Sequence, residues 1–394
     1  MGRDGMRVAV VGAGIAGLTA AAALNRAGVR TRVFEQTGHL GEVGAGIQLS
    51  PNATGLLHRL GLGDSLASVA VRLEAIEMRR WDTDEVLMRT ELGDACEEMY
   101  GAPYLSVHRA DLHRLLLDRV PDDTVTLGAR CTGVEERGDE VVLRFADGTT
   151  ETADVVVGAD GIHSAVRETL VADEPRYSGQ TVYRGLVPAD RLGHLLTEPR
   201  VMIRLGPGRH CVCYPISGGK QISFVATAPA DEWRTESWTE PASTRELVAA
   251  YDGWTEDVRE LLGAADSVTR WALHDRDTVG RWSTDRITIA GDAAHPMLPF
   301  GAQGANQGIE DAVALAACLR TATADTVPEA LVRYEAARRP RTEAVHRTIR
   351  ENARNHHVAD GAEQRDRDRS MNERWGLRGQ EWLFGYDAEA AVTG

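Results

Sequence analysis

Three stretches of the sequence each combine a short apolar run, a glycine turn and a carboxylate. They are VAVVGAGIAG from Val8, with an acid further on at Glu35, VVVGADGIHSAVRE from Val155, and ITIAGDAAHPMLPFGAQGANQGIEDA from Ile287. Each apolar run has the length of a buried strand, and glycine allows the chain to turn sharply where the strand ends. Because open α/β sheets bind ligands at the carboxyl ends of their strands, the three turns predict one extended ligand held at several points.

The first stretch has the full pattern of a dinucleotide-binding βαβ unit. Gly12, Gly14 and Gly17 permit, in turn, a tight turn, close approach of a pyrophosphate to the backbone and close packing of helix on strand. The helix that follows offers free N–H groups and a positive dipole end to phosphates. Glu35 ends the second strand, where a carboxylate accepts hydrogen bonds from a ribose. The alternative is a glycine-rich turn that binds nothing, and the motif alone does not choose between FAD and NAD.

The elements that must position these turns follow from the hydrophobic pattern. RVAVV, which begins at Arg7, is apolar on both faces like a strand of a buried parallel sheet, and an alanine-rich helix and the strand TRVFE complete the unit. Between residues 181 and 228 short alternating strands are separated by Gly and Pro, which predicts an antiparallel sheet in an inserted domain, with IEMRRW near Ile76 as another strand. Residues 305–354 are helical and charged in pattern.

Composition limits the possible partners. The chain has 394 residues, enough for two domains, and a formal net charge of −15, which disfavours nucleic acid and anionic membranes. Five scattered cysteines do not form a disulfide framework, and no grouping of cysteine or histidine predicts a metal site. No run of 18 apolar residues predicts a membrane span. We therefore expect a cytoplasmic protein with reduced cysteines.

The three glycine motifs resemble, in order, the fingerprints of the single-component flavoprotein aromatic hydroxylases, the p-hydroxybenzoate hydroxylase-like class. Further stretches are similar to the branch with salicylate hydroxylase, 3-hydroxybenzoate 6-hydroxylase and 6-hydroxynicotinate 3-monooxygenase. These stretches are GAGIQLSPNA from Gly44, YRGLVP from Tyr183 and HDRDTVGRWSTDRITIAGDAAHPM from His274. The resemblance runs from about Arg7 to Arg341, and more weakly through EWLFGYDAEA. Three ordered motifs over this span make it specific.

The resemblance implies a fold and a division into domains. The expected fold is α/β, with a Rossmann-like FAD-binding domain, an inserted antiparallel-sheet substrate domain and C-terminal helices. We expect residues 1–72, 101–178 and 276–354 to form the FAD-binding domain, with long helices in its last part. Residues 73–100 and 179–275 are expected to form the substrate domain, and 355–394 a C-terminal helical tail.

The resemblance also implies which residues hold FAD. Asp292 would accept a hydrogen bond from a ribityl hydroxyl, and the small-residue loop after Pro299 would admit the flat isoalloxazine. Arg109 would reach the FAD phosphates, and Asp160 would adjoin FAD and a transient nicotinamide. A helix N-cap role for Asp292 and a surface position for Arg109 stay open as alternatives. The expected cofactor-binding residues are Gly12, Gly14, Ala16, Gly17, Glu35, Gln36, Ile47, Gln48, Arg109, Cys131, Asp160, Asp292, Pro299, Gly304, Ala305 and Asn306.

The chemistry implied by the resemblance is the hydroxylation of a small phenolic or amino/hydroxy aromatic carboxylate. NADH or NADPH reduces FAD, and dioxygen then gives a C4a-hydroperoxyflavin that the aromatic ring attacks. A base near the substrate hydroxyl favours this step, because deprotonating a phenol raises ring nucleophilicity. His210 is our catalytic candidate together with Tyr214, since the two residues face the same side of one strand. They also resemble the His–Tyr pair of the hydroxynicotinate branch. A packed histidine is the alternative.

Other side chains are predicted to contact the substrate or to have structural roles. The expected substrate-binding residues are Gln48, Arg184, His210, Tyr214, Leu298 and Phe300. Some relatives carry a histidine or another polar group at Phe300, and this chain lacks it. Arg184 would pair with a substrate carboxylate or with an acid inside the sheet. We interpret Arg167 as support for its loop, His295 as structural, and the pair His356-His357 as a solvated surface.

Competing functions remain at this stage. An FAD-dependent epoxidase, or a hydroxylase of a larger natural product, fits the same motifs, and a flavin-binding regulatory module without turnover is a third option. A flavin halogenase would need a W-x-W-x-I-P signature, which is absent. Only residues 355–394 follow the last long helical region, which favours a compact single-ring acid over a larger substrate. The sequence does not determine the oligomeric state, and a homodimer is compatible with it.

Overall fold

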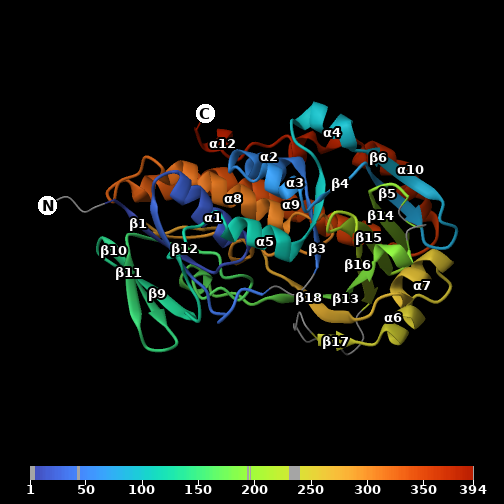
Figure 1. The fold of residues 1–394 in the computed structure, drawn as a ribbon, viewed down its shortest axis with the longest axis horizontal. Coiled ribbons are helices and arrows are strands. Elements are labelled where there is room, and N and C mark those ends of the chain that lie inside the picture. The colour runs from blue at the N-terminus through green and yellow to red at the C-terminus, as the bar shows by residue number, and fades with distance from the viewer. Residues whose placement is uncertain (1–4, 42–44, 193–194, 196, 230–239, 394) are drawn as a thin grey trace.

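The computed structural model describes residues 5–41, 45–192, 195, 197–229 and 240–393. Gly44, at the start of one of the motifs, lies outside these residues. The molecule is elongated, with the N-terminal strands toward one end and a large sheet at the other (Figure 1). The long helices α8 and α9 extend between the two regions; they span Gly304–Leu319 and Val327–His356.

A five-stranded parallel sheet carries the three glycine motifs. Its order is β19-β12-β1-β2-β8. The strands span Arg7–Val11 (β1), Arg30–Phe34 (β2), Val125–Thr126 (β8), Val155–Gly158 (β12) and Ile287–Ile289 (β19). Every residue of β12 and β19 is buried, as expected for parallel strands covered on both faces. Because β19, β12 and β1 are neighbours, their carboxyl ends bring the three turns to one edge.

Helices cover this sheet. Helix α1 (Ile15–Arg26) contacts both α8 and α5 (Arg109–Leu117). Nine of the twelve α1 residues are buried, which explains why the sequence there is rich in alanine rather than amphipathic. A separate three-stranded antiparallel sheet lies beside the domain, formed by β9 (Cys131–Arg137), β10 (Glu140–Phe145) and β11 (Thr150–Ala153). The apolar core is continuous from these strands to α8.

An eight-stranded, mainly antiparallel sheet forms the second region. Its order is β17-β18-β13-β16-β15-β14-β5-β6, and only β14 and β5 pair in parallel. The strands span Ala75–Arg80 (β5), Val86–Glu91 (β6), Arg176–Pro188 (β13), Arg200–Gly206 (β14), Arg209–Ile216 (β15), Gln221–Pro229 (β16), Glu240–Ala242 (β17) and Val268–Asp275 (β18). The predicted antiparallel sheet, including the strand near Ile76, is therefore present.

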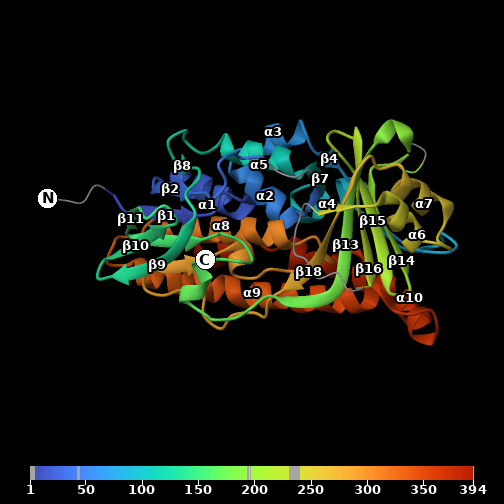
Figure 2. The ribbon, with the colours of Figure 1, turned by 90° about the horizontal axis from the view of Figure 1, so that it is seen from below.

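The two faces of this sheet have different environments. Helices α6 (Thr244–Ala250) and α7 (Glu256–Gly263) pack on one face, where Cys211 and Cys213 join an apolar cluster (Figure 2). The opposite face contacts the FAD-side loops and α9, through a second cluster that includes Tyr214 and Phe300. The alternation of strand residues thus divides β15 into a structural face and a face toward the interior of the molecule.

Further short elements lie along the chain between the elements already described. They are β3 (Gly46–Leu49), β4 (Val71–Arg72), β7 (Leu105–His108), α2 (Pro51–Arg59), α3 (Gly63–Ala67), α4 (Gly93–Tyr100) and the 3-10 turns η1 (Arg167–Thr169), η2 (Ala189–Arg191) and η3 (Gly291–Ala293). The chain ends in α10 (Ala362–Trp375), η4 (Leu377–Gln380), α11 (Glu381–Phe384) and α12 (Ala390–Thr393). Within the described part of the chain, no helix has the length and apolar character needed to cross a membrane.

Candidate functional site

Close backbone contacts join the three glycine turns. Gly12 has φ +101°, and a Cβ atom there would lie 2.3 Å from the carbonyl oxygen of Ala159, in the second motif. A Cβ atom on Gly291, in the third motif, would lie 2.8 Å from the Cβ of Ala16. Any larger residue would push these turns apart. The glycines therefore bring the three motifs into direct contact along one continuous wall, and the single extended ligand expected there stays a prediction.

The N-terminus of α1 is open toward one end of this wall. A Cβ atom on Gly14 would meet nothing within 4 Å, and no side chain caps the helix there. Free N–H groups and open space suit a phosphate group. The Glu35 carboxylate accepts hydrogen bonds from the backbone N–H of Ala13 (2.8 Å) and of Thr37 (2.9 Å). Glu35 thus fixes the turn, and its contact with a ribose stays a prediction.

Asp292 lies at the other end of the wall. Its side chain is exposed although its sequence neighbours are buried, and no hydrogen bond from the described residues reaches its carboxylate. The surrounding protein nevertheless raises the pKa of Asp292, mainly by desolvation, against the opposing charges of His295 and Arg109. Both observations describe a carboxylate inside an open cleft. Asp292 caps no helix among the described residues, so the N-cap alternative is not supported.

Helix α8 begins beside Asp292. An added Cβ on Gly304, its first residue, would lie 3.9 Å from the Asp292 Oδ1, and no side chain caps the helix. Asn306 in its first turn donates from Nδ2 to the carbonyl oxygen of Gln48 (3.1 Å), which links the loop to β3. A second uncapped helix N-terminus therefore faces the same cleft, with the small residues of the Pro299 loop around it.

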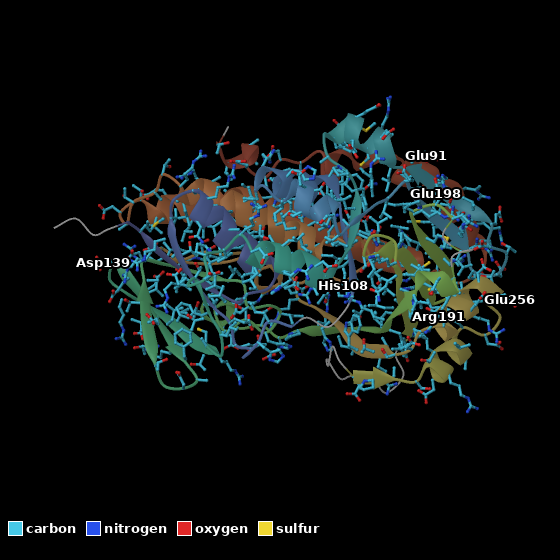
Figure 3. The ribbon with its side chains drawn as sticks, viewed as in Figure 1. Glu91, His108, Asp139, Arg191, Glu198 and Glu256 are labelled. Atoms are coloured by element: carbon cyan, nitrogen blue, oxygen red, sulfur yellow. The ribbon has the colours of Figure 1, made fainter. Side chains whose placement is uncertain are left out.

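Arg109 enters the site from α5. It follows the half-buried His108, labelled in Figure 3, whose ring nitrogen accepts from the backbone N–H of Ala110 and caps the helix. Burial has the larger effect on the pKa of Asp292 and of Arg184, and the charge of Arg109 lowers both, so Arg109 acts electrostatically on the two groups. Arg109 is half-buried, so it is not a fully exposed surface residue, and its contact with a cofactor stays a prediction.

Asp160 and Arg167 stabilise the second motif. Asp160 accepts hydrogen bonds from the Ser164 hydroxyl and from the backbone N–H of Ala165 (2.8 Å), and burial raises its pKa. Its charge in turn raises the pKa of Cys131, after the larger effect of burial. The fully buried Arg167 pairs with Asp173 (2.8 Å) and donates to the carbonyl groups of residues 293 and 294. Arg167 thus supports the loop, as predicted.

The interior face of the large sheet presents the predicted catalytic pair. His210 and Tyr214 are both buried on β15, at 2% and 4% exposure. The Tyr214 hydroxyl donates to the carbonyl oxygen of Gly46 (2.7 Å), and burial raises its pKa. The His210 ring lies 5.2 Å from the ring of Phe300 between centroids. The sheet and the loop between Asp292 and α8 therefore meet at His210.

Arg184 and Gln48 complete this face. Arg184 pairs across the sheet with Val225, and Val225 pairs with Val212, which places Arg184 on the same face as the catalytic pair. Its guanidinium stacks on Trp271 at 4.3 Å, and burial lowers its pKa to about 10. The Gln48 carboxamide accepts from the hydroxyl of Tyr104 (2.9 Å). A partly buried cation beside apolar walls suits an aromatic acid.

The interpretation of His356-His357 as a solvated surface is wrong. His356 is 4% exposed, and its ring centroid lies 5.1 Å from that of His210. The Nε2 atom of His357 lies 2.9 Å from the Nδ1 atom of His210. The error has a physical cause: the polar pattern of α9 describes most of its length, but its last turn packs against β15. No local signal in the sequence indicated this contact.

A buried ionic network beneath the wall was also not predicted. Arg338 pairs with Glu310 and with Asp311 (2.8 Å), and Arg341 pairs with Glu310 (3.1 Å). Asp311 accepts from the Gly291 N–H (2.8 Å) and contacts the His295 Nε2 (2.6 Å), so His295 is structural as predicted. The adjacent acids of GIEDA and the arginines of ARRPR are the signal that could have indicated this network.

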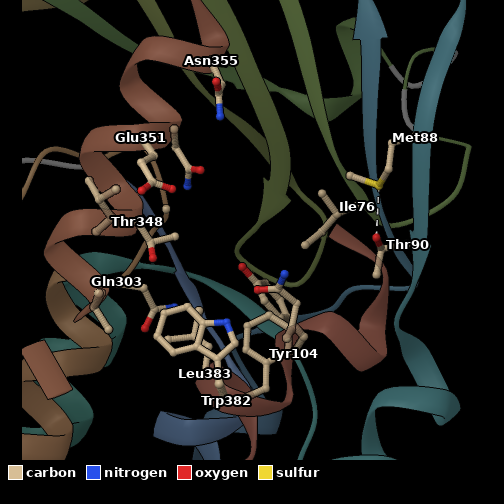
Figure 4. A pocket seen from close by; sticks show the side chains of 16 residues that line it. Ile76, Met88, Thr90, Tyr104, Gln303, Thr348, Glu351, Asn355, Trp382 and Leu383 are labelled. Atoms are coloured by element: carbon tan, nitrogen blue, oxygen red, sulfur yellow. Dashed lines mark hydrogen bonds between the residues drawn. The ribbon is translucent and has the colours of Figure 1, made fainter. Parts of the chain in front are cut away.

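A cavity of about 230 Å³ lies beside the site (Figure 4). Strands β5 and β6, helix α9 and the C-terminal helix α11 line it, with Thr348 and Glu351 on one side and Ile76 and Met88 on the other. None of the described residues lining it is basic. It therefore does not match a carboxylate, and the Arg184 face is the better candidate for one.

Comparisons with known proteins agree with this geometry. Residues 5–348 match the model of the FAD binding domain family. A 3-amino-4-hydroxybenzoate 2-monooxygenase from Streptomyces platensis is 54% identical, over 97% of this chain and 96% of that protein. A 6-hydroxynicotinate 3-monooxygenase from Pseudomonas fluorescens is 39% identical, over 88% and 91%. A solved salicylate hydroxylase substrate complex superposes with a TM-score of 0.85 at 31% identity, over 99% and 98%.

Proposed function

Because the chain belongs to the FAD binding domain family and is an FAD-dependent aromatic-ring monooxygenase, we propose that it hydroxylates 3-amino-4-hydroxybenzoate or a close amino-hydroxy aromatic acid. Its electrons come from NADH or NADPH, and dioxygen is the co-substrate. The relatives that act on this acid support the proposal, and so does a site built for a small anionic ring. The sequence predicted a small phenolic or amino/hydroxy aromatic carboxylate as the substrate. The proposal narrows this class to acids that carry both an amino and a hydroxyl group on one ring.

The residues of the cleft fit FAD. The open N-terminus of α1 at Gly14 suits the pyrophosphate, and the accessible carboxylate of Asp292 suits a ribityl hydroxyl. The positive end of α8 at Gly304 stabilises negative charge on the flavin ring. Bound FAD supplies the redox chemistry and the activation of oxygen. The protein supplies binding, orientation and exclusion of water.

The side chains of the interior sheet face can orient and activate the ring. Arg184 binds the substrate carboxylate through charge-assisted hydrogen bonds. His210 accepts the proton of the ring hydroxyl, which raises the electron density of the ring toward an electrophilic oxygen. Leu298 and Phe300, 7% and 3% exposed, shield the ring from water. Tyr214 fixes β3 through Gly46 and borders the ring.

One observation carries the proposal. His210, Tyr214 and Arg184 come from two strands but share one buried face, and this face meets the loop between Asp292 and α8 at Phe300. A base, a cation and an apolar wall therefore converge beside the cleft suited to FAD. An aromatic acid with a ring hydroxyl can interact with all three groups, whereas an apolar polyene has no polar group to offer His210 or Arg184.

The test is NADH and NADPH oxidation by the purified holoenzyme, with hydrogen peroxide measured in parallel and the product analysed by mass spectrometry. The panel is 3-amino-4-hydroxybenzoate, 3-hydroxybenzoate, salicylate and 6-hydroxynicotinate. We expect the first acid to stimulate oxidation most, with little peroxide and one added oxygen atom in the product. If none of the acids stimulates oxidation, or if all electrons leave as peroxide, the proposal fails and the epoxidase or larger-substrate alternative replaces it.

The same preparation tests the other predictions. The assay with the two pyridine nucleotides shows which one the enzyme prefers. We propose a homodimer, which light scattering after size exclusion would test, and a cytoplasmic location, which cell fractionation would test.

A further inference from the structure

His357 contacts the proposed catalytic base. It follows the last residue of α9, and its Nε2 atom lies 2.9 Å from the Nδ1 atom of His210. The Thr227 hydroxyl lies 3.1 Å from the same His210 nitrogen and 3.3 Å from His357 Nε2. His210 is fully enclosed, whereas His357 is only partly buried. Two imidazoles and a hydroxyl thus form a chain from the sheet face toward α9.

The hydrogen bonds determine where the protons lie. The Ala353 carbonyl, one turn back on α9, hydrogen-bonds to the His357 ring. Because Nε2 of His357 faces His210, the nitrogen that donates to Ala353 is Nδ1. A neutral His357 then has a lone pair at Nε2. With the Thr227 hydroxyl donating to the His210 carbonyl oxygen (3.3 Å), the nearer donor to this lone pair is the His210 Nδ1–H, at 2.9 Å. The Nε2 atom of a neutral His210 therefore carries a lone pair, and no hydrogen bond from the described residues reaches it.

We propose that His357 is a positioning residue that holds His210 as its Nδ1–H tautomer, so that the His210 Nε2 lone pair accepts the proton of the substrate hydroxyl. The inference rests on the proposed function for its catalytic part. The proton moves from the ring hydroxyl to His210 Nε2, which leaves a phenolate and an imidazolium as a neutral pair. His357 stabilises that imidazolium by accepting its Nδ1–H, as the third member of a catalytic triad does.

The surroundings keep the pair neutral before substrate binds. Burial lowers the pKa of His210 well below its usual value and that of His357 to about 4. The groups facing His210 are His356 and His357 from α9, Thr227 from β16, Phe300 from the loop, and the hydroxyl of Tyr251, which donates to the His210 carbonyl. None of these is an acid. The phenolate formed by the proton transfer therefore supplies the counter-charge of the imidazolium.

The tautomer is tested first, by ¹⁵N NMR of histidine-labelled holoenzyme without substrate. We expect His210 to show a protonated Nδ1 and an unprotonated Nε2, and we expect His357→Phe to lose this pattern. His357→Gln retains an acceptor for His210 and a donor for Ala353, so this variant should keep the wild-type protonation pattern of His210. His346→Gln, a buried histidine on the same helix without contact to His210, is the control. A protonated Nε2 on wild-type His210 overturns the proposal whether or not the acid is a substrate.

The catalytic part is tested by kinetics with 3-amino-4-hydroxybenzoate. We expect His357→Phe to lower kcat for coupled hydroxylation roughly 10- to 100-fold, with KM changed little, as typical of residues that orient a reactive group. His357→Gln should recover most of the loss. Unchanged kcat in a folded His357→Phe enzyme overturns the proposal. If His357→Phe does not fold, the wild-type tautomer and the His357→Gln rate decide. An unstimulated wild type instead contradicts the proposed function, and the NMR result still stands.

Discussion

Asp292 combines two properties that rarely occur together in one carboxylate. It is accessible in the cleft, yet desolvation raises its pKa, while the charges of His295 and Arg109 act in the opposite direction. A hydroxyl group placed against it would form a charge-assisted hydrogen bond in a partly dry environment. Its position beside the N-terminus of α8 makes it the point where the third motif can hold a bound flavin.

Removing this carboxylate should weaken FAD binding. We expect Asp292→Ala to raise the FAD dissociation constant roughly 10- to 100-fold, because a hydrogen bond to a charged group contributes about 1.5–3 kcal/mol. Asp292→Asn should lose less FAD affinity than Asp292→Ala, because the amide keeps one hydrogen-bond acceptor. The measurement is the quenching of flavin fluorescence on titration of apoenzyme, with the exposed Asp325→Ala as control. Equal affinity in Asp292→Ala and wild type would contradict the assignment.

Arg184 should act on substrate affinity rather than on the chemical step. We expect Arg184→Met to raise KM for 3-amino-4-hydroxybenzoate more than tenfold, because the substrate carboxylate would lose a partly buried cation. The compound 2-aminophenol lacks the carboxylate and should be oxidised equally by both enzymes. Arg191→Met, at an exposed pair with Asp266, is the matched control. If KM for the acid is unaffected, the ion-pair alternative inside the sheet becomes the better account of Arg184.

Helices α8 and α9 are fixed to the third motif by buried charges. Arg338 is fully buried and joins Glu310 and Asp311, and Asp311 holds the Gly291 turn. Burial by itself raises the pKa of Asp311, but His295 and Arg338 outweigh it and lower the pKa to about 2. The network thus ties the loop that carries Asp292 to the two longest helices of the domain.

Breaking this network should be far more costly than breaking a surface pair. We expect Arg338→Met to lower the free energy of unfolding by about 3–5 kcal/mol, because it removes the fully buried cation shared by two buried carboxylates, which keep only Arg341 and His295. The adjacent Arg339 pairs on the surface with Glu343 (3.0 Å), so Arg339→Met should cost no more than about 0.5 kcal/mol. Urea unfolding of both variants, each saturated with FAD, measures the difference. Similar losses in the two would contradict a structural role for the network.

The sequence predicted those elements whose signals are local. The strand, glycine turn and helix of the first motif lie within 30 residues, and the alternation in β15 places His210 and Tyr214 on one face, so both could be anticipated. The contact between His210 and His357 joins residues 147 apart, and the polar pattern of α9 gives no indication of it. The Arg338 network likewise depends on how two helices pack. Tertiary contacts of this kind are set by packing rather than by periodicity.

At the scale of the molecule, α9 connects the FAD-side domain to the large sheet and ends in a histidine cluster. The His210 ring centroid lies 5.1 Å from that of His356 and 5.0 Å from that of His357. Burial lowers the pKa of each, to about 3 for His356 and about 4 for His357. His346, also on α9, has a lowered pKa through burial and the charge of Arg350. These lowered pKa values favour the neutral form of all four histidines at neutral pH.

Acid should destabilise the fold for this reason. A histidine whose folded pKa is depressed remains neutral in the native state, whereas the unfolded chain binds a proton as the pH falls below about 6.5. Stability is thus complete above this pH and is lost below it, by about 1.4 kcal/mol per pH unit for each such group until its folded pKa is reached. Asp311, with a pKa of about 2, contributes no loss above about pH 4. Between pH 7 and pH 5 the histidines should dominate the decline.

His356→Leu isolates one of these groups. Leucine does not titrate, so the variant should lose less unfolding free energy than wild type as the pH falls from 6.5 to 5. The difference is the contribution of one histidine proton, up to about 2 kcal/mol at pH 5. His39→Leu removes an exposed histidine and should leave the dependence unchanged. Urea unfolding at pH 7, 6 and 5, with saturating FAD, gives the pH dependence of the unfolding free energy for wild type and both variants.

The comparison uses the slopes of these dependences, so a lower absolute stability of His356→Leu does not affect it. A wild-type slope in His356→Leu would mean that His356 is protonated in the native state, and the buried cluster would then carry charge before any substrate binds.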